Sequence, residues 1–115
     1  MNKEQLLKFF VSLFPEFEKY WNSEGDIYRD DDDYSGYAVC AVFSWYFRAS
    51  YSEFSHKDLE MLFQKIEEFV SDEEDLDTAN ALCTCFLENI AGEEVGNFSR
   101  TFMGNKSKEF FDCWS

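Results

Sequence analysis

The side chains that do chemistry in enzymes are few in this sequence and poorly grouped. His56 is the only histidine, and it falls at the expected start of a helix, where an exposed first-turn residue is more common than a general base. Cys83 and Cys85 point in different directions on a helix and have no second pair of ligands, so they do not form a zinc knuckle. Because catalysis needs a nucleophile with a base, or a set of metal ligands, we expect no enzyme, no metal site and no cofactor.

An acidic run, Asp30–Asp33, lies in the expected loop of residues 22–34. Counted from Asp31, Gly36 reaches the turn position of a calcium-binding loop, but Val42 occupies the twelfth position, where such loops carry a bidentate glutamate. The match therefore fails. Four consecutive aspartates repel one another and stay solvated, so the segment is either a hydrated turn or a loop that binds a partner.

The charge of the chain restricts the partners that it can bind. Among 115 residues, 24 are acidic and 10 are basic, for a formal net charge of -14. Such a field repels nucleic acids and anionic membranes, and it attracts basic proteins and cations. Acidity also keeps proteins soluble, which is an alternative explanation. We expect a basic protein partner, with no nucleic acid and no membrane.

The composition is that of a folded domain. Hydrophobic residues make up 45% and aromatic residues 20% of the chain, which is enough for a core in one α-helical domain over residues 1–115 and leaves some aromatic surface for an interface. Lys3, Glu4 and Lys8 interrupt the apolar part of the first residues, and no cleavage-site pattern follows. These features predict a cytoplasmic protein with reduced thiols.

The elements that would position a site are expected to be helices, centred on a hairpin over residues 55–92. Ser55 starts its first helix with a capping pattern, and Gly92 follows its second at a left-handed cap position. The acidic connection is short, which favours antiparallel packing. Asn80 is expected to be buried and to bond a neighbouring helix. The apolar stripes are Leu59, Leu62, Phe63, Ile66, Phe69 and Val70, then Leu76, Ala79, Leu82, Cys83, Phe86, Leu87 and Ile90.

Other segments add helices on both sides of this hairpin. Residues 3–14 form an amphipathic helix that Pro15 ends, and a second helix follows from Pro15. Residues 37–54 suit a strand by composition, but their length and lack of alternation favour a buried helix. A short helix around Phe98 and a terminal helix near the end complete an all-α fold, a single compact bundle of five to six helices arranged as antiparallel hairpins.

Part of the sequence resembles a group of small bacterial α-helical proteins that includes immunity proteins. The resemblance rests on FPEF at residues 14–17, on an acidic connection, and on hairpin positions that are mostly core residues: Phe63, Ile66, Glu67, Asn80, Leu82, Phe86, Leu87 and Glu88. Many such proteins are partners of contact-dependent inhibition or polymorphic toxins. The resemblance implies a cognate toxin, often a nuclease, that is kept inactive in the producing cell. Together with the acidic charge, it leads us to expect an inhibitor that covers the active-site cleft of a basic toxin, plausibly an RNase.

The candidate partner-binding residues are the acids and tyrosines of two expected loops. Acids would steer a basic partner and tyrosines would anchor it. If the two loops lie on one side, they form one surface. Two alternatives remain open: a helical adaptor or regulatory subunit without a toxin partner, and a thiol-dependent enzyme that uses His56. The candidates are Glu24, Asp26, Tyr28, Asp30, Asp31, Asp32, Asp33, Tyr34 and Tyr37, with Asp72, Glu73, Glu74 and Asp75.

Overall fold

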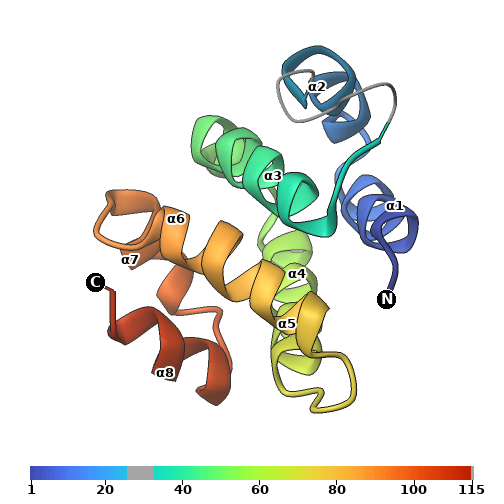
Figure 1. The fold of residues 1–115 in the computed structure, drawn as a ribbon. Coiled ribbons are helices and arrows are strands. Elements are labelled where there is room, and N and C mark those ends of the chain that lie inside the picture. The colour runs from blue at the N-terminus through green and yellow to red at the C-terminus, as the bar shows by residue number, and fades with distance from the viewer. Residues whose placement is uncertain (26–32, 115) are drawn as a thin grey trace.

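The computed structural model describes residues 1–25 and 33–114, and these residues form a compact all-α fold (Figure 1). No β-strand occurs in the described part of the chain. The helices are α1 (Lys3–Leu13), α2 (Phe17–Glu24), α3 (Gly36–Ser50), α4 (His56–Val70), α5 (Leu76–Leu82), α6 (Glu88–Ile90), α7 (Glu94–Arg100) and α8 (Asn105–Asp112). A 3₁₀ turn η2 (Tyr51–Glu53) follows α3, and a π-helical segment η3 (Cys83–Leu87) joins α5 to α6.

The expected number of five to six helices is wrong, because the described residues form seven when α5, η3 and α6 are taken as one continuous helix. The expected range was too low because the two short segments around Phe17 and Phe98 each form a separate helix, α2 and α7. Helix α7 begins at Glu94, earlier than the short helix expected around Phe98, and its Val95 and Gly96 are buried. The all-α prediction itself is confirmed.

Helix α3 lies at the centre of the molecule, between α1 and α2 on one side and the α5–α6 helix on the other (Figure 1). The helix preferred over the strand alternative for residues 37–54 is confirmed up to Ser50, and the 3₁₀ turn η2 follows it. Ser35 caps the helix start, with its Oγ accepting a hydrogen bond from the Ala38 N–H at 3.1 Å. The Phe43 ring is fully buried and stacks on Phe10 at 4.0 Å between centroids. Packing on all sides explains why this segment shows no clean apolar alternation.

The central hairpin forms largely as expected. Ser55 caps α4, and Leu59, Leu62, Phe63 and Ile66 are buried. Helices α4 and α5 pack on each other after the short connection, and α5 continues through η3 to Ile90. Gly92 has the expected left-handed backbone, with φ of 77°.

Two expectations for the second helix of the hairpin are wrong. Asn80 is exposed, and Leu76 is 62% exposed. The buried positions just inside the helix are Thr78, Ala79, Ala81 and Leu82, and the 100° step per residue of a helix places Asn80 and Leu76 on the opposite side.

Asn89, not Asn80, ties this helix to α3. Its Nδ2 donates to the buried Ser44 Oγ at 3.1 Å and to the Cys85 carbonyl at 2.7 Å. Ser44 in turn donates to the Ala41 carbonyl at 2.6 Å. A serine inside an otherwise apolar run was the signal for this contact, because a buried hydroxyl needs a partner.

A carboxylate from α4 caps the start of α8. Asn105 is the first residue of this helix, and Gly104 stands at the cap position without a side-chain acceptor. Glu67 supplies the acceptor instead. Its Oε2 accepts from the Lys106 N–H at 3.0 Å, and its Oε1 accepts from the N–H and the Oγ of Ser107, each at 2.9 Å. Burial alone would raise the pKa of Glu67, but these donors outweigh burial and hold the pKa below its ordinary value.

Replacing Glu67 with alanine is expected to cost about 1–2 kcal/mol, because buried Ser107 loses its acceptor and α8 loses its cap. Amide hydrogen exchange in α8 should then become faster. Because folding lowers the pKa of Glu67, the carboxylate stabilises the fold at neutral pH, and this stabilisation is lost as the pH falls below about 4. Glu68→Ala is the control, since Glu68 is exposed and pairs only with Lys65, at 3.2 Å, in the described chain. Equal exchange rates in the two variants would contradict this role.

Candidate interaction surface

The structure describes eight of the thirteen candidate partner-binding residues. Asp26, Tyr28, Asp30, Asp31 and Asp32 lie outside the described residues. The described candidates are Glu24, which is exposed at the end of α2, then Asp33, Tyr34 and Tyr37, and finally Asp72, Glu73, Glu74 and Asp75 in the connection before α5.

The first residues of the chain connect Asp33 with the acidic connection before α5. Lys3 Nζ pairs with Asp33 Oδ1 at 2.8 Å. The Thr78 hydroxyl donates to the Met1 carbonyl at 3.2 Å, and the Met1 amine pairs with the Asp75 carboxylate. Since Met1 and Lys3 are separated by one residue, Asp33 and Asp75 lie at the same end of the molecule despite their distance in the sequence. We define the acidic end as Asp33, Asp72, Glu73, Glu74, Asp75 and Asp77.

The carboxylates of the acidic end differ in how they are bonded. Hydrogen bonds from the Met1 amine and from Thr78 lower the pKa of Asp75, and the bond from Lys3 lowers the pKa of Asp33. Both carboxylates are therefore ionised at neutral pH. The side chains of Glu73, Glu74 and Asp77 make no hydrogen bond or ion pair in the part of the chain that the structure describes. The acidic end therefore has six carboxylates, of which Asp33 and Asp75 are paired with the two cations, and negative charge is in excess.

Exposed apolar side chains accompany these acids. Tyr37 is 41%, Met1 42% and Leu76 62% exposed, and all three lie at or beside the acidic end. Tyr34 differs, because its half-buried ring packs edge-on against Trp21 at 5.1 Å and lies 4.8 Å from Lys3 Nζ. An apolar centre with a charged rim is the usual composition of a protein interface. Tyr37 is therefore a better anchor candidate than Tyr34.

A hollow with a volume of ≈ 280 Å³ opens at this end, between the N-terminal ends of α1, α3 and α5. Its lining includes the buried side chains of Leu6, Thr78 and Ala81 and the exposed side chains of Tyr37 and Asp77. The remaining lining comes from residues 1–3, 35 and 36. Sequence reasoning did not identify this hollow, because its walls come from three helices that are distant in the sequence.

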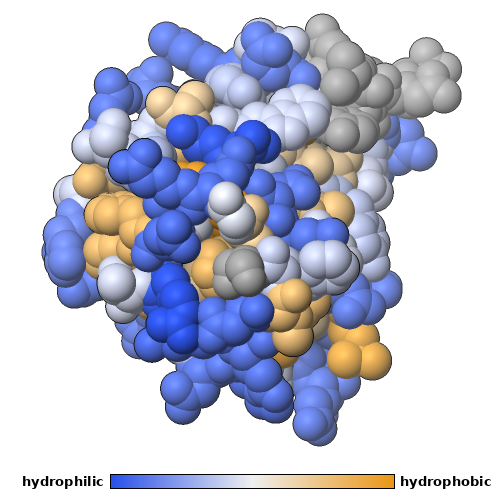
Figure 2. Space-filling model, turned by 90° about the vertical axis from the view of Figure 1, so that its left-hand side faces the viewer, coloured by the Kyte–Doolittle hydropathy of each residue, from blue (hydrophilic) through white to orange (hydrophobic). Residues whose placement is uncertain are grey.

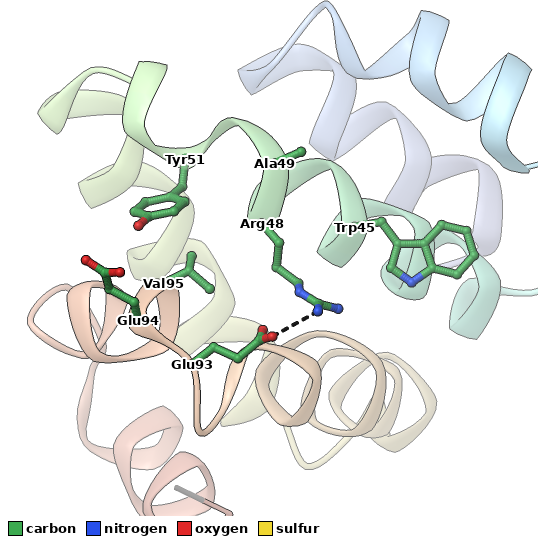
Figure 3. Close-up of a pocket in the computed structure, with 7 residues that line it drawn as sticks. All are labelled: Trp45, Arg48, Ala49, Tyr51, Glu93, Glu94 and Val95. Atoms are coloured by element: carbon green, nitrogen blue, oxygen red, sulfur yellow. Dashed lines mark hydrogen bonds and ion pairs between the residues drawn. The ribbon is translucent and has the colours of Figure 1, made fainter.

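A second hollow, of ≈ 550 Å³, lies between the C-terminal half of α3 and the start of α7 (Figure 3). Arg48 reaches across it, and its Nη2 pairs with Glu93 Oε1 at 2.9 Å. The other oxygen, Glu93 Oε2, is buried and has no hydrogen-bond partner among the described residues. Trp45, Ala49, Tyr51, Glu94 and Val95 complete the lining. The Arg48 charge is already paired across this hollow, which contains no nucleophile with a base.

The residues considered for catalysis have other contacts or are buried. His56 is exposed and its Nε2 lies 2.9 Å from Glu60 Oε1, one turn along the same helix. Burial raises the pKa of the Cys40 thiol, with a smaller contribution from Cys85, and burial also raises the pKa of Cys83. Protonated thiols are weak nucleophiles. In residues 1–25 and 33–114, no three His, Cys, Asp or Glu side chains gather as metal ligands do. None of the described helices has the length and apolarity needed to span a membrane.

The contact between Thr78 and Met1 should hold the acidic end together. Thr78→Val is expected to cost about 1–2 kcal/mol of stability, because the buried hydroxyl shares its single hydrogen between the Met1 carbonyl, 3.2 Å from Oγ1, and Asp75 Oδ2, at 2.8 Å. Thermal unfolding should show this loss, and amide exchange at the start of α1 should accelerate. Thr101→Val removes an exposed hydroxyl that bonds only the nearby Phe98 carbonyl in the described chain, and should change little. A Thr78→Val variant as stable as Thr101→Val would contradict the contact.

The comparisons with known proteins identify a family without assigning it an activity. A family model described as a domain of unknown function, DUF7674, matches residues 7–114. No curated protein and no solved structure matches the chain. The match includes α2 to α8 and most of α1, and so covers nearly all of the fold described above. The chain belongs to the DUF7674 family.

Proposed function

We propose that this protein is an inhibitor that binds a basic protein domain through its acidic end. In this proposal it is a cytoplasmic bacterial immunity protein, and its partner is a cognate toxin of a contact-dependent inhibition or polymorphic toxin system. An RNase domain is the first class of toxin to test, because an enzyme that binds the phosphates of a nucleic acid tends to have a basic active-site cleft. The observation that supports the proposal best is that Asp33 lies at the same end of the molecule as the acids of residues 72–77, although the two are distant in the sequence.

The physical argument combines charge with apolar contact. The acidic end would attract a basic cleft over a distance comparable to the Debye length, about 8–10 Å at physiological salt. Tyr37, Met1 and Leu76 would then exclude water at the centre of the contact. Solubility alone requires no particular placement of charge. Inhibition would follow from occlusion of the cleft, and no chemistry would be needed from the inhibitor.

A second candidate function is that of a helical adaptor, which would dock a neutral partner elsewhere. Phe98 is 41% exposed and forms an aromatic cluster with Tyr51 at 5.4 Å and with Phe102 at 5.5 Å. Figure 2 shows the side of the molecule where α6 and α7 lie, and its hydrophobic residues form separate patches among hydrophilic ones. On this side the hydrophobic residues do not form one continuous groove of the kind that an adaptor would use. The acidic end is therefore the preferred surface.

Removing charge from the acidic end should slow binding. The triple variant Asp72→Asn, Glu73→Gln, Glu74→Gln is expected to bind the basic polypeptide recovered from native cells about tenfold more slowly at low salt, with a flatter salt dependence. Association can be followed by stopped flow. The control, Glu53→Gln, Glu94→Gln, Glu109→Gln, removes the same charge from exposed residues of η2, α7 and α8. If both variants slow association equally, only net charge matters and the acidic end is not the interface.

A further inference from the structure

The hollow at the acidic end has the size of a side-chain pocket. Its volume of ≈ 280 Å³ is at or below the lower limit of sites for drug-sized molecules, about 300–1,000 Å³. Leu6 and Ala81 are each 2% exposed and supply the apolar lining of the hollow. Asp77 and Tyr37 also line the hollow, and both residues are exposed. An occupant that suits this arrangement has an apolar stem and a polar tip.

The charge around the hollow favours a cation. Two cations line it, but Lys3 is paired with Asp33 and the Met1 amine with Asp75. Asp77 has no ion-pair partner in the described chain, and the acids of the preceding connection add to the negative field.

Three helix N-termini also point to this end, and their dipoles would favour an anion. However, each start already has a side-chain cap. Asn2 Oδ1 accepts from the Gln5 N–H at 2.8 Å, Ser35 Oγ from the Ala38 N–H at 3.1 Å, and Asp75 Oδ1 from the Thr78 N–H at 3.2 Å. Capping satisfies donors that an anion would otherwise use.

We propose that this hollow receives one arginine side chain of the partner, which pairs with Asp77 and lays its methylene stem against Leu6 and Ala81. Arginine suits the site better than lysine, because its planar guanidinium binds a carboxylate and can also stack on the ring of Tyr37. This inference rests on the proposed function, since the arginine belongs to the basic partner. To the proposed function, this inference adds the hollow as the place where the partner is anchored and an arginine side chain as the group that is recognised there.

The test uses the full chain and a probe that needs no partner. N-acetyl-L-arginine methylamide is titrated against isotope-labelled protein, with the uncharged isostere N-acetyl-L-citrulline methylamide and with acetate as comparison probes. We expect saturable amide shift changes at Tyr37, Asp77, Thr78 and Ala81 with the arginine probe, and binding at least about tenfold weaker with citrulline, which corresponds to the loss of the ion pair. Asp77→Asn should reduce arginine binding to the citrulline level, and Glu109→Gln, on α8, should leave it unchanged.

Three results would overturn the arginine anchor: shifts spread over all acidic surfaces, equal binding of arginine and citrulline, or saturable binding of acetate in place of arginine. The proposed function fails separately. A basic partner that depends on the acidic end, combined with no binding of the arginine probe in the hollow, would overturn only the anchor. Binding of the probe in the hollow, with no basic partner recovered from cells, would support the anchor site and overturn the proposed partner.

Discussion

Gly96→Ala is expected to destabilise the fold by about 3 kcal/mol or more. Gly96 is buried in α7, where this helix packs against the end of α6. An alanine Cβ at this position would lie 2.1 Å from the Ile90 carbonyl oxygen and 3.0 Å from Phe111 Cζ. Because the closest atom belongs to the backbone, a change of side-chain rotamer cannot relieve the overlap, and α7 would have to move away from α6.

Gly92→Ala is the matched control for this substitution. Gly92 has φ of 77°, but a Cβ there would meet nothing within 4 Å. Only backbone strain destabilises the Gly92→Ala variant, and its free energy of unfolding is expected to fall by about 1 kcal/mol. Urea unfolding followed by circular dichroism compares the two variants. If Gly96→Ala loses no more stability than Gly92→Ala, then α7 does not pack on α6 as closely as described.

Phe43→Ala should also destabilise the fold strongly, and its free energy of unfolding is expected to fall by about 3–5 kcal/mol. The Phe43 ring lies at the centre of the core, 4.0 Å from Phe10, 5.1 Å from Phe17 and 5.5 Å from Phe86 between centroids. It thus joins α1, α2 and η3 to α3. Truncation would leave a cavity that four rigid elements cannot fill by small movements.

Tyr37→Ala, a substitution in the same helix, serves as a comparison that distinguishes the effect of core packing on stability from the effect of a surface contact on binding. Tyr37 is 41% exposed, so its truncation should change the unfolding midpoint little. The same substitution should weaken binding of the basic partner, because it removes an anchor at the acidic end. An equal loss of stability in Phe43→Ala and Tyr37→Ala, measured by thermal unfolding, would contradict the central position of Phe43.

The sequence predicted the helices well because local rules determine them. Ser35 and Ser55 cap α3 and α4, Pro15 precedes α2, and Gly92 follows α6 with a left-handed backbone. Apolar spacing identified the buried side of α4 without error between Leu59 and Ile66. These signals lie within a few residues of the feature that they produce, and so they can be interpreted without tertiary structure.

Local rules do not predict contacts between segments that are distant in the sequence. The Glu67 carboxylate caps α8 from another helix, and no local pattern marks that pairing. Asn80 was expected to be buried, but Asn89 makes the interhelical bond to Ser44. The candidate surface shows the same limit. From the sequence alone, it could be stated only that the two acidic loops form one surface if they lie on one side. The contacts of Lys3 and Met1 place Asp33 and Asp75 at the same end of the molecule.

Recovery of the partner from native cells tests the proposed function most directly. The protein is used as bait and washed at low and then at high salt, in parallel with the triple variant Asp72→Asn, Glu73→Gln, Glu74→Gln and its charge-matched control. We expect the wild type and the control to retain a basic polypeptide at low salt and to lose it at high salt, and the triple variant to retain much less. A neutral partner that resists high salt and binds all three proteins equally would contradict the acidic end as the interface, as would the absence of any basic partner.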